Sequence, residues 1–171
     1  TDRGLVAGLL GMRPDDERIP DSFEIARKMS LSYSFGIANL TSAHPNSVVL
    51  EVKGKSGRTL EVQACSLGGG RIMINRLDGL DVNCSCEIPT LIVHNLDQPG
   101  HVAEVTSMLA HKSVNIANMS LYRDKRGGSA VMVVEMDQPL PKESLEWLEH
   151  LEGIVKVTYI NVTEGEEDDV L

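Results

Sequence analysis

Hydrophobic and polar residues follow a regular pattern through the second half of the chain, and this pattern predicts six elements. Apolar residues recur at every second position in four short segments, which indicates strands, and at every third or fourth position in two others, which indicates helices. In the order strand, helix, strand, strand, helix, strand, the predicted bounds are 91–95, 102–111, 115–124, 129–137, 142–151 and 154–162. This βαββαβ order is that of the split βαβ, ferredoxin-like fold, in which two helices cover one face of a four-stranded antiparallel sheet.

The first of these helices and the uncovered face of the predicted sheet carry two further expectations. The helix should bury one apolar face, made of Val102, Val105, Met108 and Leu109. Because no predicted helix covers the other face of the sheet, we expect that face to pair with another domain or with a second copy of the chain.

The first half of the chain combines helices with a series of strands. Residues 1–30 are typical of two helices, the first with Thr1 and Asp2 as capping residues, and residues 33–40 are expected to be extended. Four strand-like segments follow, joined by glycine-containing loops and turns, with the bounds 47–53, 59–64, 71–77 and 80–88. Pro89 marks the predicted domain boundary. We therefore predict an α+β chain with an N-terminal α/β domain, a βαββαβ domain and an acidic, disordered tail, over 1–88, 89–163 and 164–171.

Composition and charge exclude several classes of partner. The chain has 171 residues, of which 42% are hydrophobic and only 4% aromatic, so two aliphatic cores are expected. A net charge of −9 argues against nucleic acids and anionic membranes, since both attract basic surfaces. The apolar runs are too short to span a membrane, no signal peptide opens the chain, and the cysteines are too few for a disulfide framework. We expect a cytoplasmic protein and, because the chain starts at Thr1 without an initiating methionine, a piece of a longer one.

Polar residues gather where the first strand of the second half ends. Asn95 and Asp97 come shortly before Pro99-Gly100, where the helix begins, and the N–H groups of a helix start are free to bind small polar ligands. Asn115 opens the next strand, and we expect it to lie near Asn95 and Asp97 beside the helix. These side chains are equally typical of ordinary turns, and the nearby histidines His94 and His101 could equally be solvated. The ligand interpretation indicates a protein that senses a small molecule.

Two further groups of polar and glycine residues lie in the first half. Three consecutive glycines, Gly68, Gly69 and Gly70, follow Ser66 and could point backbone N–H groups at a carboxylate, or simply form a corner between strands. His44 and Asn46 flank a proline directly before a strand, where they could bind a ligand or cap the loop.

The sequence contains no arrangement typical of a catalytic or metal centre. Cys84 and Cys86 are two residues apart in a predicted strand, which places both side chains on one face. The further ligands that a four-ligand metal site would need are not apparent, so buried thiols are the better interpretation. No Ser/His/Asp or Cys/His combination indicates a nucleophile. We expect no catalytic residue and no metal site on this chain.

The second half resembles an ACT domain, an amino-acid-sensing module. The resemblance covers about 89–163 and depends on two motifs, Asn95-Leu96-Asp97-Gln98-Pro99-Gly100 and Val114-Asn115-Ile116-Ala117. In serine-sensing members, residues at these motifs hold the amino acid, although they have His and Asn before the turn where this chain has Asn and Asp. The resemblance implies a ligand site made of Asn95, Asp97, Gly100, Asn115 and Ile116.

The first half resembles the allosteric substrate-binding domain of bacterial iron–sulfur L-serine dehydratases. The resemblance rests on His44-Pro45-Asn46, on the segment 66–72, and on the segments 1–5 and 14–20. It implies a second ligand site, made of His44, Asn46, Ser66, Gly68, Gly69 and Gly70. An earlier N-terminal segment of that family is missing here, which fits a truncated chain.

Together the two halves are similar to the beta chain of two-chain L-serine dehydratases. The resemblance implies a regulatory subunit that binds L-serine or a related small carboxylate, self-associates through its ACT domain and functions in gluconeogenesis. An alpha subunit would carry the [4Fe–4S] cluster and convert L-serine to pyruvate and ammonia. Two alternatives stay open at this point: the regulatory region of a phosphoglycerate dehydrogenase-like enzyme, and a free-standing ACT amino-acid sensor.

Overall fold

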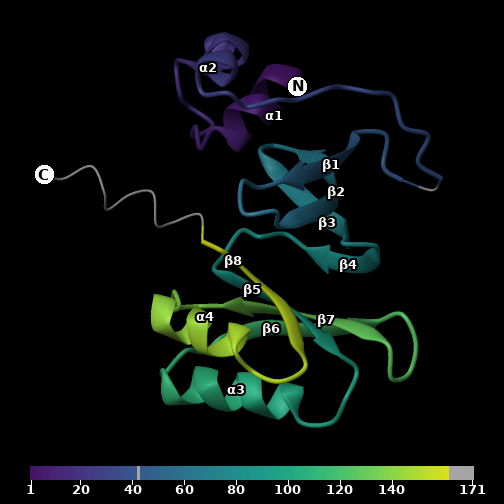
Figure 1. Cartoon of the computed structure of the whole chain (residues 1–171), viewed down its shortest axis with the longest axis vertical. Helices are drawn as coiled ribbons and strands as arrows, with labels where there is room; N and C mark the ends of the chain where they lie inside the picture. The colour runs from purple at the N-terminus through teal and green to yellow at the C-terminus, as the bar shows by residue number, and fades with distance from the viewer. Residues whose placement is uncertain (42, 162–171) are drawn as a thin grey trace, which may run out of the picture. The chain divides into compact units, whose positions relative to one another are not determined.

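Residues 1–41 and 43–161 are described by a computed structural model. The chain divides into two units, Thr1–Thr41 and Ser42–Leu171, and each is described by itself below. Figure 1 shows the course of the chain, with the two sheets of the second unit and the helices of the first.

The first unit consists of two short helices and an extended segment. Its elements are α1 (Asp2–Leu9), the 3₁₀ helix η1 (Ile19–Asp21) and α2 (Ser22–Lys28). Thr1 occupies the N-cap position of α1 without a side-chain hydrogen bond, so the predicted cap is not formed there. The Ser22 hydroxyl of α2 instead donates to the backbone oxygen of Arg3 at 2.9 Å and ties the two helices together.

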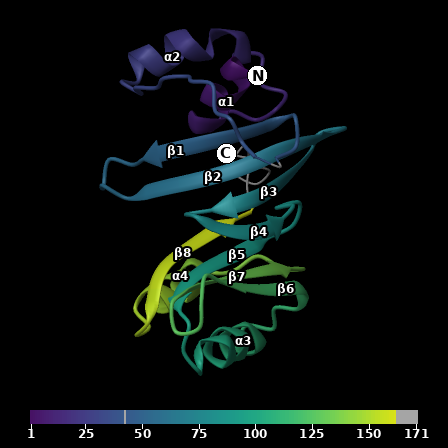
Figure 2. The same ribbon diagram turned by 90° about the vertical axis from the view of Figure 1, so that its right-hand side faces the viewer.

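The second unit begins with a four-stranded antiparallel sheet, which we call the first sheet. Its strands are β1 (Ser47–Lys53), β2 (Thr59–Gly68), β3 (Arg71–Leu77) and β4 (Leu80–Cys84), arranged in chain order (Figure 2). The last strand is shorter than the predicted range 80–88, because Cys86 adopts a left-handed backbone conformation with φ of +54°.

The second sheet has the predicted βαββαβ order. Its elements are β5 (Thr90–Leu96), α3 (His101–His111), β6 (Ile116–Arg123), β7 (Ser129–Met136), α4 (Lys142–Glu149) and β8 (Ile154–Ile160). The strands are antiparallel in the order β6-β7-β5-β8, and α3 and α4 lie together on one face (Figure 1). The predicted α+β, ferredoxin-like fold class is confirmed.

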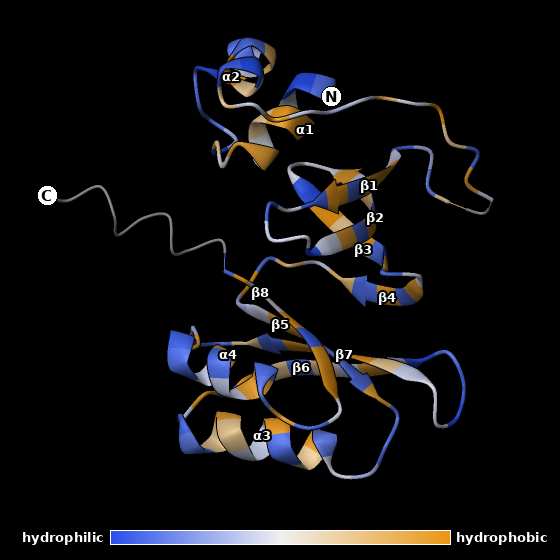
Figure 3. Ribbon diagram, viewed as in Figure 1, coloured by the Kyte–Doolittle hydropathy of each residue, from blue (hydrophilic) through white to orange (hydrophobic). Residues whose placement is uncertain are grey.

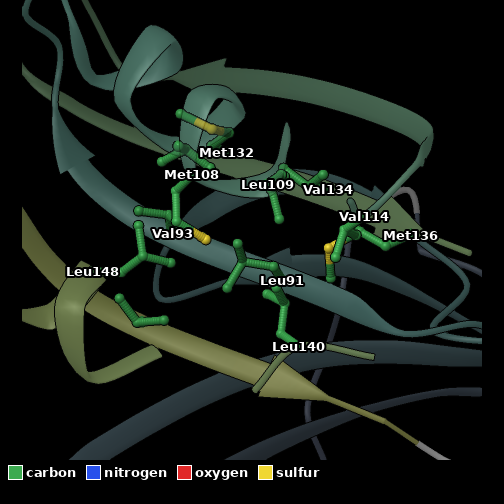
Figure 4. Packing of buried hydrophobic residues seen from close by; sticks show 12 residues of the cluster. Leu91, Val93, Met108, Leu109, Val114, Met132, Val134, Met136, Leu140 and Leu148 are labelled. Atoms are coloured by element: carbon green, nitrogen blue, oxygen red, sulfur yellow. The ribbon is translucent and has the colours of Figure 1, made fainter. Parts of the chain in front are cut away.

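One core lies between the second sheet and its two helices (Figure 4). Leu91 and Val93 of β5 are fully buried in it with Leu109 of α3 and Leu148 of α4. The predicted face of α3 is wrong at one position, since Val102 is 40% exposed. His101 is buried instead, because it lies one helical turn before Val105 on the buried face of α3.

A second core covers the opposite face of the same sheet. Ile92 of β5 and Val131 and Val133 of β7 cluster with Ile74 of β3 and Val82 of β4. The first sheet therefore covers the face of the second sheet that has no helices. Of the two expected partners for this face, another domain or a second copy of the chain, the structure shows the first. Figure 3 shows that the β6–β7 loop is polar.

Two expectations stay untested. The domain ranges 1–88 and 89–163 stay a prediction, and the two units described here divide at residue 41 instead. The predicted acidic tail, 164–171, lies outside the described residues. Within the described part of the chain, no helix combines the length and apolar character needed to cross a bilayer.

Candidate ligand-binding site

The corner between the end of β5 and the start of α3 holds two buried polar side chains. Asn95 donates from Nδ2 to the backbone oxygen of Leu96 at 2.7 Å, but its Oδ1 atom has no hydrogen-bond partner among the described residues. The His101 Nδ1 atom lies 3.3 Å from Glu104 Oε2. Its buried Nε2 atom has no hydrogen-bond partner among the described residues. Burial of a polar atom without a hydrogen bond costs free energy. The corner therefore offers an amide oxygen and a ring nitrogen to a ligand.

Both side chains border the same turn, which precedes β8. Asn95 is paired with Ile154, and the Leu96 N–H donates to the backbone oxygen of Gly153 at 2.9 Å. A Cβ atom on Gly153 would lie 2.5 Å from His101 Nε2, so only glycine leaves room for the imidazole. These contacts place Asn95 and His101 at one corner of the molecule. The sequence patterns had left His101 as possibly solvated, and the structure shows that it is buried.

Gly100 forms the N-cap of α3 and adopts φ of +110°, a conformation that favours glycine. Among the described residues, no side chain caps this helix end. The first N–H groups of a helix have no carbonyl partner within the helix and carry partial positive charge. A carboxylate at this corner would therefore face hydrogen-bond donors.

Asp97 binds the β6–β7 hairpin and does not face the corner with a free carboxylate. Its Oδ2 atom accepts hydrogen bonds from the Gly127 N–H at 2.9 Å and from Arg123 Nη1 at 3.0 Å. The hydrogen bond from Gly127, aided by Arg123, lowers the pKa of the Asp97 carboxyl. Asp97 positions the hairpin, and its role as a ligand contact stays a prediction.

Asn115 and Ile116 lie at the opposite end of the sheet from Asn95. In the strand register, Asn95 is paired with Ala130 and Ile116 with Met136, and the Asn115 carbonyl accepts from the Asp137 N–H. Ala130 and Asp137 are seven residues apart, or about 23 Å along a strand. The expectation that Asn115 lies near Asn95 within one chain is wrong. Because β5 and β6 run parallel and are linked through α3, the start of β6 returns to the level where β5 begins.

Asn115 has polar partners of its own. Its Nδ2 atom donates to Asp137 Oδ2 at 2.6 Å, and its backbone N–H donates to Gln138 Oε1 at 2.7 Å. The side chain is exposed, so the amide oxygen remains accessible to a ligand or to another chain.

The structure brings together the predicted residues at one end of the first sheet. The Ser66 N–H donates to the backbone oxygen of Asn46 at 3.0 Å. Asn46 in turn donates its N–H to His44 Nδ1 at 3.2 Å. All three are exposed and lie where β1 begins and β2 ends, so His44, Asn46 and Ser66 form one polar surface, as their grouping in one site requires.

The three glycines form a tight turn beside this surface. Gly68 is paired with Arg71, and the two residues between them, Gly69 and Gly70, have φ of +62° and +78°. Positive φ at both central residues defines a type I′ hairpin turn, which explains the glycines without a ligand. The Gly68 N–H donates to Ser66 Oγ at 3.4 Å, so it is not a free donor. Carboxylate binding by these glycines stays a prediction.

A cluster that the sequence patterns missed joins the two sheets. Asp78, in the β3–β4 turn, accepts from Lys156 Nζ of β8 at 2.5 Å, and its other oxygen accepts from the Glu61 N–H at 2.9 Å. His94 of β5 lies 3.6 Å from the same carboxylate, and Lys156 also donates to the backbone oxygen of Thr59. In the sequence, Asp78-Gly79 indicated only a turn, because the residues that contact Asp78 in the structure are distant from it along the chain. His94 is buried, which excludes the solvated alternative.

The electrostatics of this cluster follow from burial and charge. Burial by itself would raise the pKa of Asp78, but the hydrogen bonds from Lys156 and the Glu61 N–H outweigh it and the pKa is lowered. Burial lowers the pKa of His94, and the attraction of Asp78 opposes this effect only in part. His94 therefore favours its neutral form beside an ionised Asp78.

A hollow of about 520 Å³ lies beside the cluster, between the β1–β2 loop, β8 and α4. Its lining includes the cationic residues Arg58 and Lys156, but both already have partners. Arg58 donates to the Val157 backbone oxygen, and Lys156 binds Asp78. The hollow thus offers no free cation for a carboxylate among its described lining residues.

Comparison with known proteins assigns the family. The model of the ACT domain family matches residues 89–152. An L-serine dehydratase beta chain of Peptoniphilus asaccharolyticus is 32% identical over 163 residues, which cover 95% of this chain and 73% of the relative. A probable L-serine dehydratase beta chain of Bacillus subtilis is 32% identical over 160 residues, with 94% and 72% coverage. The chain belongs to the L-serine dehydratase beta chain family.

Outside the beta chain family, the chain is similar to parts of a larger enzyme. A D-3-phosphoglycerate dehydrogenase of Methanocaldococcus jannaschii is 31% identical over 90 residues, which cover 53% of this chain but 17% of the relative. A D-3-phosphoglycerate dehydrogenase of Bacillus subtilis is 24% identical over 162 residues, which cover 94% of this chain and 30% of the relative. In both dehydrogenases the similarity covers only part of the longer enzyme.

The donor groups of this beta chain family member do not fit an iron–sulfur cluster. Such clusters are held by several cysteine thiolates. Across 1–41 and 43–161, no three His, Cys, Asp or Glu side chains are grouped as metal ligands would be. Cys84 and Cys86 lie against each other and are buried, as expected from the sequence, and Cys65 is buried as well.

Proposed function

We propose that this chain is the regulatory beta chain of an L-serine dehydratase, an enzyme that converts L-serine to pyruvate and ammonia. In this proposal the chain binds L-serine or a related small amino-acid carboxylate, and the reaction takes place on an alpha chain that holds a [4Fe–4S] cluster. The observation that carries the proposal is the similarity to named beta chains along 95% of the chain. The donor set described above supports assigning the cluster to another chain.

The β5–α3 corner is the proposed effector site. An amino acid presents an ammonium group and a carboxylate. The unpartnered Oδ1 atom of Asn95 can accept a hydrogen bond from the ammonium group, and the first amides of α3 beside Gly100 can donate to the carboxylate. His101 Nε2 completes the corner as a further polar contact.

Asn115 would reach such a site only from a second copy of the chain. β6 lies at the edge of its sheet, so its outer side is available to pair with another β6. In an antiparallel, two-fold pairing, the beginning of one strand faces the end of the other. This places Asn115 of one copy beside Arg123 of the other, and Arg123 binds Asp97. The predicted residues Asn95, Asp97 and Asn115 would then converge across the pair.

The polar surface of His44, Asn46 and Ser66 is the proposed second ligand site. Its residues supply ring nitrogen, amide and hydroxyl groups next to the Gly69-Gly70 turn. These groups suit a small carboxylate that carries a hydroxyl group, as L-serine does.

The test is to produce the chain with and without the alpha chain and to measure the release of pyruvate from L-serine. The chain by itself should release none. The reconstituted pair should release pyruvate, and the dependence of its rate on L-serine should change when Asn95 is replaced by alanine. Release of pyruvate by the isolated chain would contradict the proposal that the reaction takes place on the alpha chain. Co-purification with a nucleotide-binding dehydrogenase would favour the phosphoglycerate dehydrogenase alternative, and the absence of any enzyme partner would favour a free-standing sensor.

A further inference from the structure

Cys84 and Cys86 face each other in the second core. Their Sγ atoms are 3.1 Å apart, and both side chains are buried, Cys84 at 1% and Cys86 at 7% exposed. They belong to the apolar cluster that contains Ile92 and Val133 of the second sheet. The proposed function uses neither residue.

The backbone conformation explains how two residues so close in sequence bring their sulfurs together. In a regular strand, residues i and i+2 have Cα atoms about 6.6 Å apart, near the upper limit for a disulfide, and their side chains run side by side. Here β4 ends at Cys84, and Cys86 turns into the left-handed region with φ of +54°. A non-glycine residue is strained in this region. The turn directs Cys86 back toward Cys84 and so pre-arranges the two sulfurs.

The two thiols differ in chemical character. The hydrogen bond from the Cys86 thiol lowers the pKa of Cys84, whereas the same contact and burial raise the pKa of Cys86. Cys84 is thus the better thiolate, and Cys86 is the partner that lies within reach of it. Together with the 3.1 Å between the two sulfurs, this difference gives the order in which they would react, Cys84 first and Cys86 second.

We propose that Cys84 and Cys86 form a reversible intrachain disulfide, a modification site where β4 ends and the linker between the two sheets begins. The oxidant is a low-molecular-weight disulfide such as glutathione disulfide. The Cys84 thiolate attacks one sulfur of the oxidant, and the oxidant's S–S bond breaks to release one glutathione thiolate. Cys86 gives its proton to the released glutathione thiolate, and its sulfur then attacks Cys84 Sγ and displaces the second glutathione. The cysteine pair loses two electrons and two protons, and the oxidant becomes two glutathione thiols.

The site in the chain gives this bond a structural consequence. The linker 85–89 joins β4 of the first sheet to β5 of the second, and Cys84 is the last residue of β4. A Cys84–Cys86 bond closes the start of this linker into a small ring. The oxidation state of the pair therefore sets how far the beginning of the linker can move away from β4.

The experiment equilibrates the full 171-residue chain with a series of glutathione redox buffers, traps free thiols by alkylation under acid quench, and maps the products by mass spectrometry. The series is run on the folded chain and in a denaturing concentration of urea. We expect the disulfide between Cys84 and Cys86, two hydrogen atoms lighter than the reduced pair. We also expect the folded chain to form it at a ratio of oxidised to reduced glutathione at least about tenfold lower than the unfolded chain does.

A Cys65→Ser variant is the matched control, since it removes the third thiol and should leave the transition unchanged. Cys84→Ser and Cys86→Ser variants should lose it entirely, and their melting temperatures show whether they still fold. If the folded chain is harder to oxidise than the unfolded one, the proposal is wrong. Bonds that involve Cys65 or a second chain, in place of the Cys84–Cys86 bond, would also overturn it.

Discussion

At the scale of single residues, the β5–α3 corner differs from the rest of the site because its polar atoms lack protein partners. Asp97 and Asn115 each bind neighbouring side chains, whereas Asn95 Oδ1 and His101 Nε2 are buried with no hydrogen bond from the described residues. A ligand gains most where it satisfies atoms that folding left unpaired. Asn95 is therefore the residue whose side chain should contribute most to binding.

We expect Asn95→Ala to weaken the binding of L-serine by about 1–3 kcal/mol, the free energy of a lost buried hydrogen bond. Isothermal titration calorimetry of the folded chain measures this difference. The matched control is Asn83→Ala, which removes an exposed amide from β4. Equal affinities for the wild type and the Asn95 variant would remove the corner from the proposed function.

At the scale of elements, the apolar spacing of the sequence predicted most helices and strands because it reflects burial within one segment. The bounds of β1 and β3 agree with the predicted ranges, and the order β5 to β8 is confirmed. Val102 and His101 show where this reasoning stops, since the polar His101 and not the apolar Val102 lies on the buried face of α3. Asn115 shows a second limit, because its distance from Asn95 depends on the direction of β6.

Long-range contacts explain the other features that the patterns missed. The binding of Asp78 to Lys156 joins residues 78 positions apart, and no local spacing could indicate it. By contrast, the grouping of His44, Asn46 and Ser66 could be predicted from the resemblance to a known family. In the structure, the pairing of β1 with β2 places the segments that carry these residues side by side.

The edge strand β6 leads to a prediction about self-association. Leu121 of β6 is 48% exposed, and a charge on an edge strand discourages pairing with another chain. If copies of the chain pair through β6, Leu121→Lys should shift the chain toward the monomer in sedimentation velocity experiments. Leu67→Lys is the control, as Leu67 is a similarly exposed leucine in β2 of the first sheet. A wild-type chain that is monomeric at all concentrations would contradict the pairing.

At the scale of the whole second unit, the two sheets are joined by apolar contacts and by the Asp78 cluster. The apolar cluster includes Ile92 and Val131 of one sheet with Ile74 and Leu77 of the other. At one side of it, His94 and Lys156 of the second sheet meet the carboxylate of Asp78. The stability of the unit should depend on pH through these titratable groups.

We expect the free energy of unfolding to fall as the pH drops from 7 to 5. Because burial lowers the pKa of His94 in the folded state, the unfolded chain takes up a proton near pH 6.5 that the folded chain does not. The slope from one such proton is at most about 1.4 kcal/mol per pH unit. The lowered pKa of Asp78 adds a second loss only at more acidic pH, where this carboxyl takes up a proton in the unfolded chain but not yet in the folded one.

Urea unfolding at a series of pH values measures this slope in the wild type and in His94→Gln. The variant should show a smaller slope between pH 7 and 5. His111→Gln, which removes an exposed imidazole from α3, is the control, and the difference between the two variants reports His94. Identical slopes for both variants would show that His94 does not titrate differently on folding.

The coverage of the second sheet on both faces constrains how an effector can act at a distance. β5 packs Leu91 and Val93 against the helices and Ile92 against the first sheet, so it cannot slide without opening voids on either side. A change that an effector causes at the end of β5 must therefore move both sheets and the two helices together, or pass along the edges of the sheets.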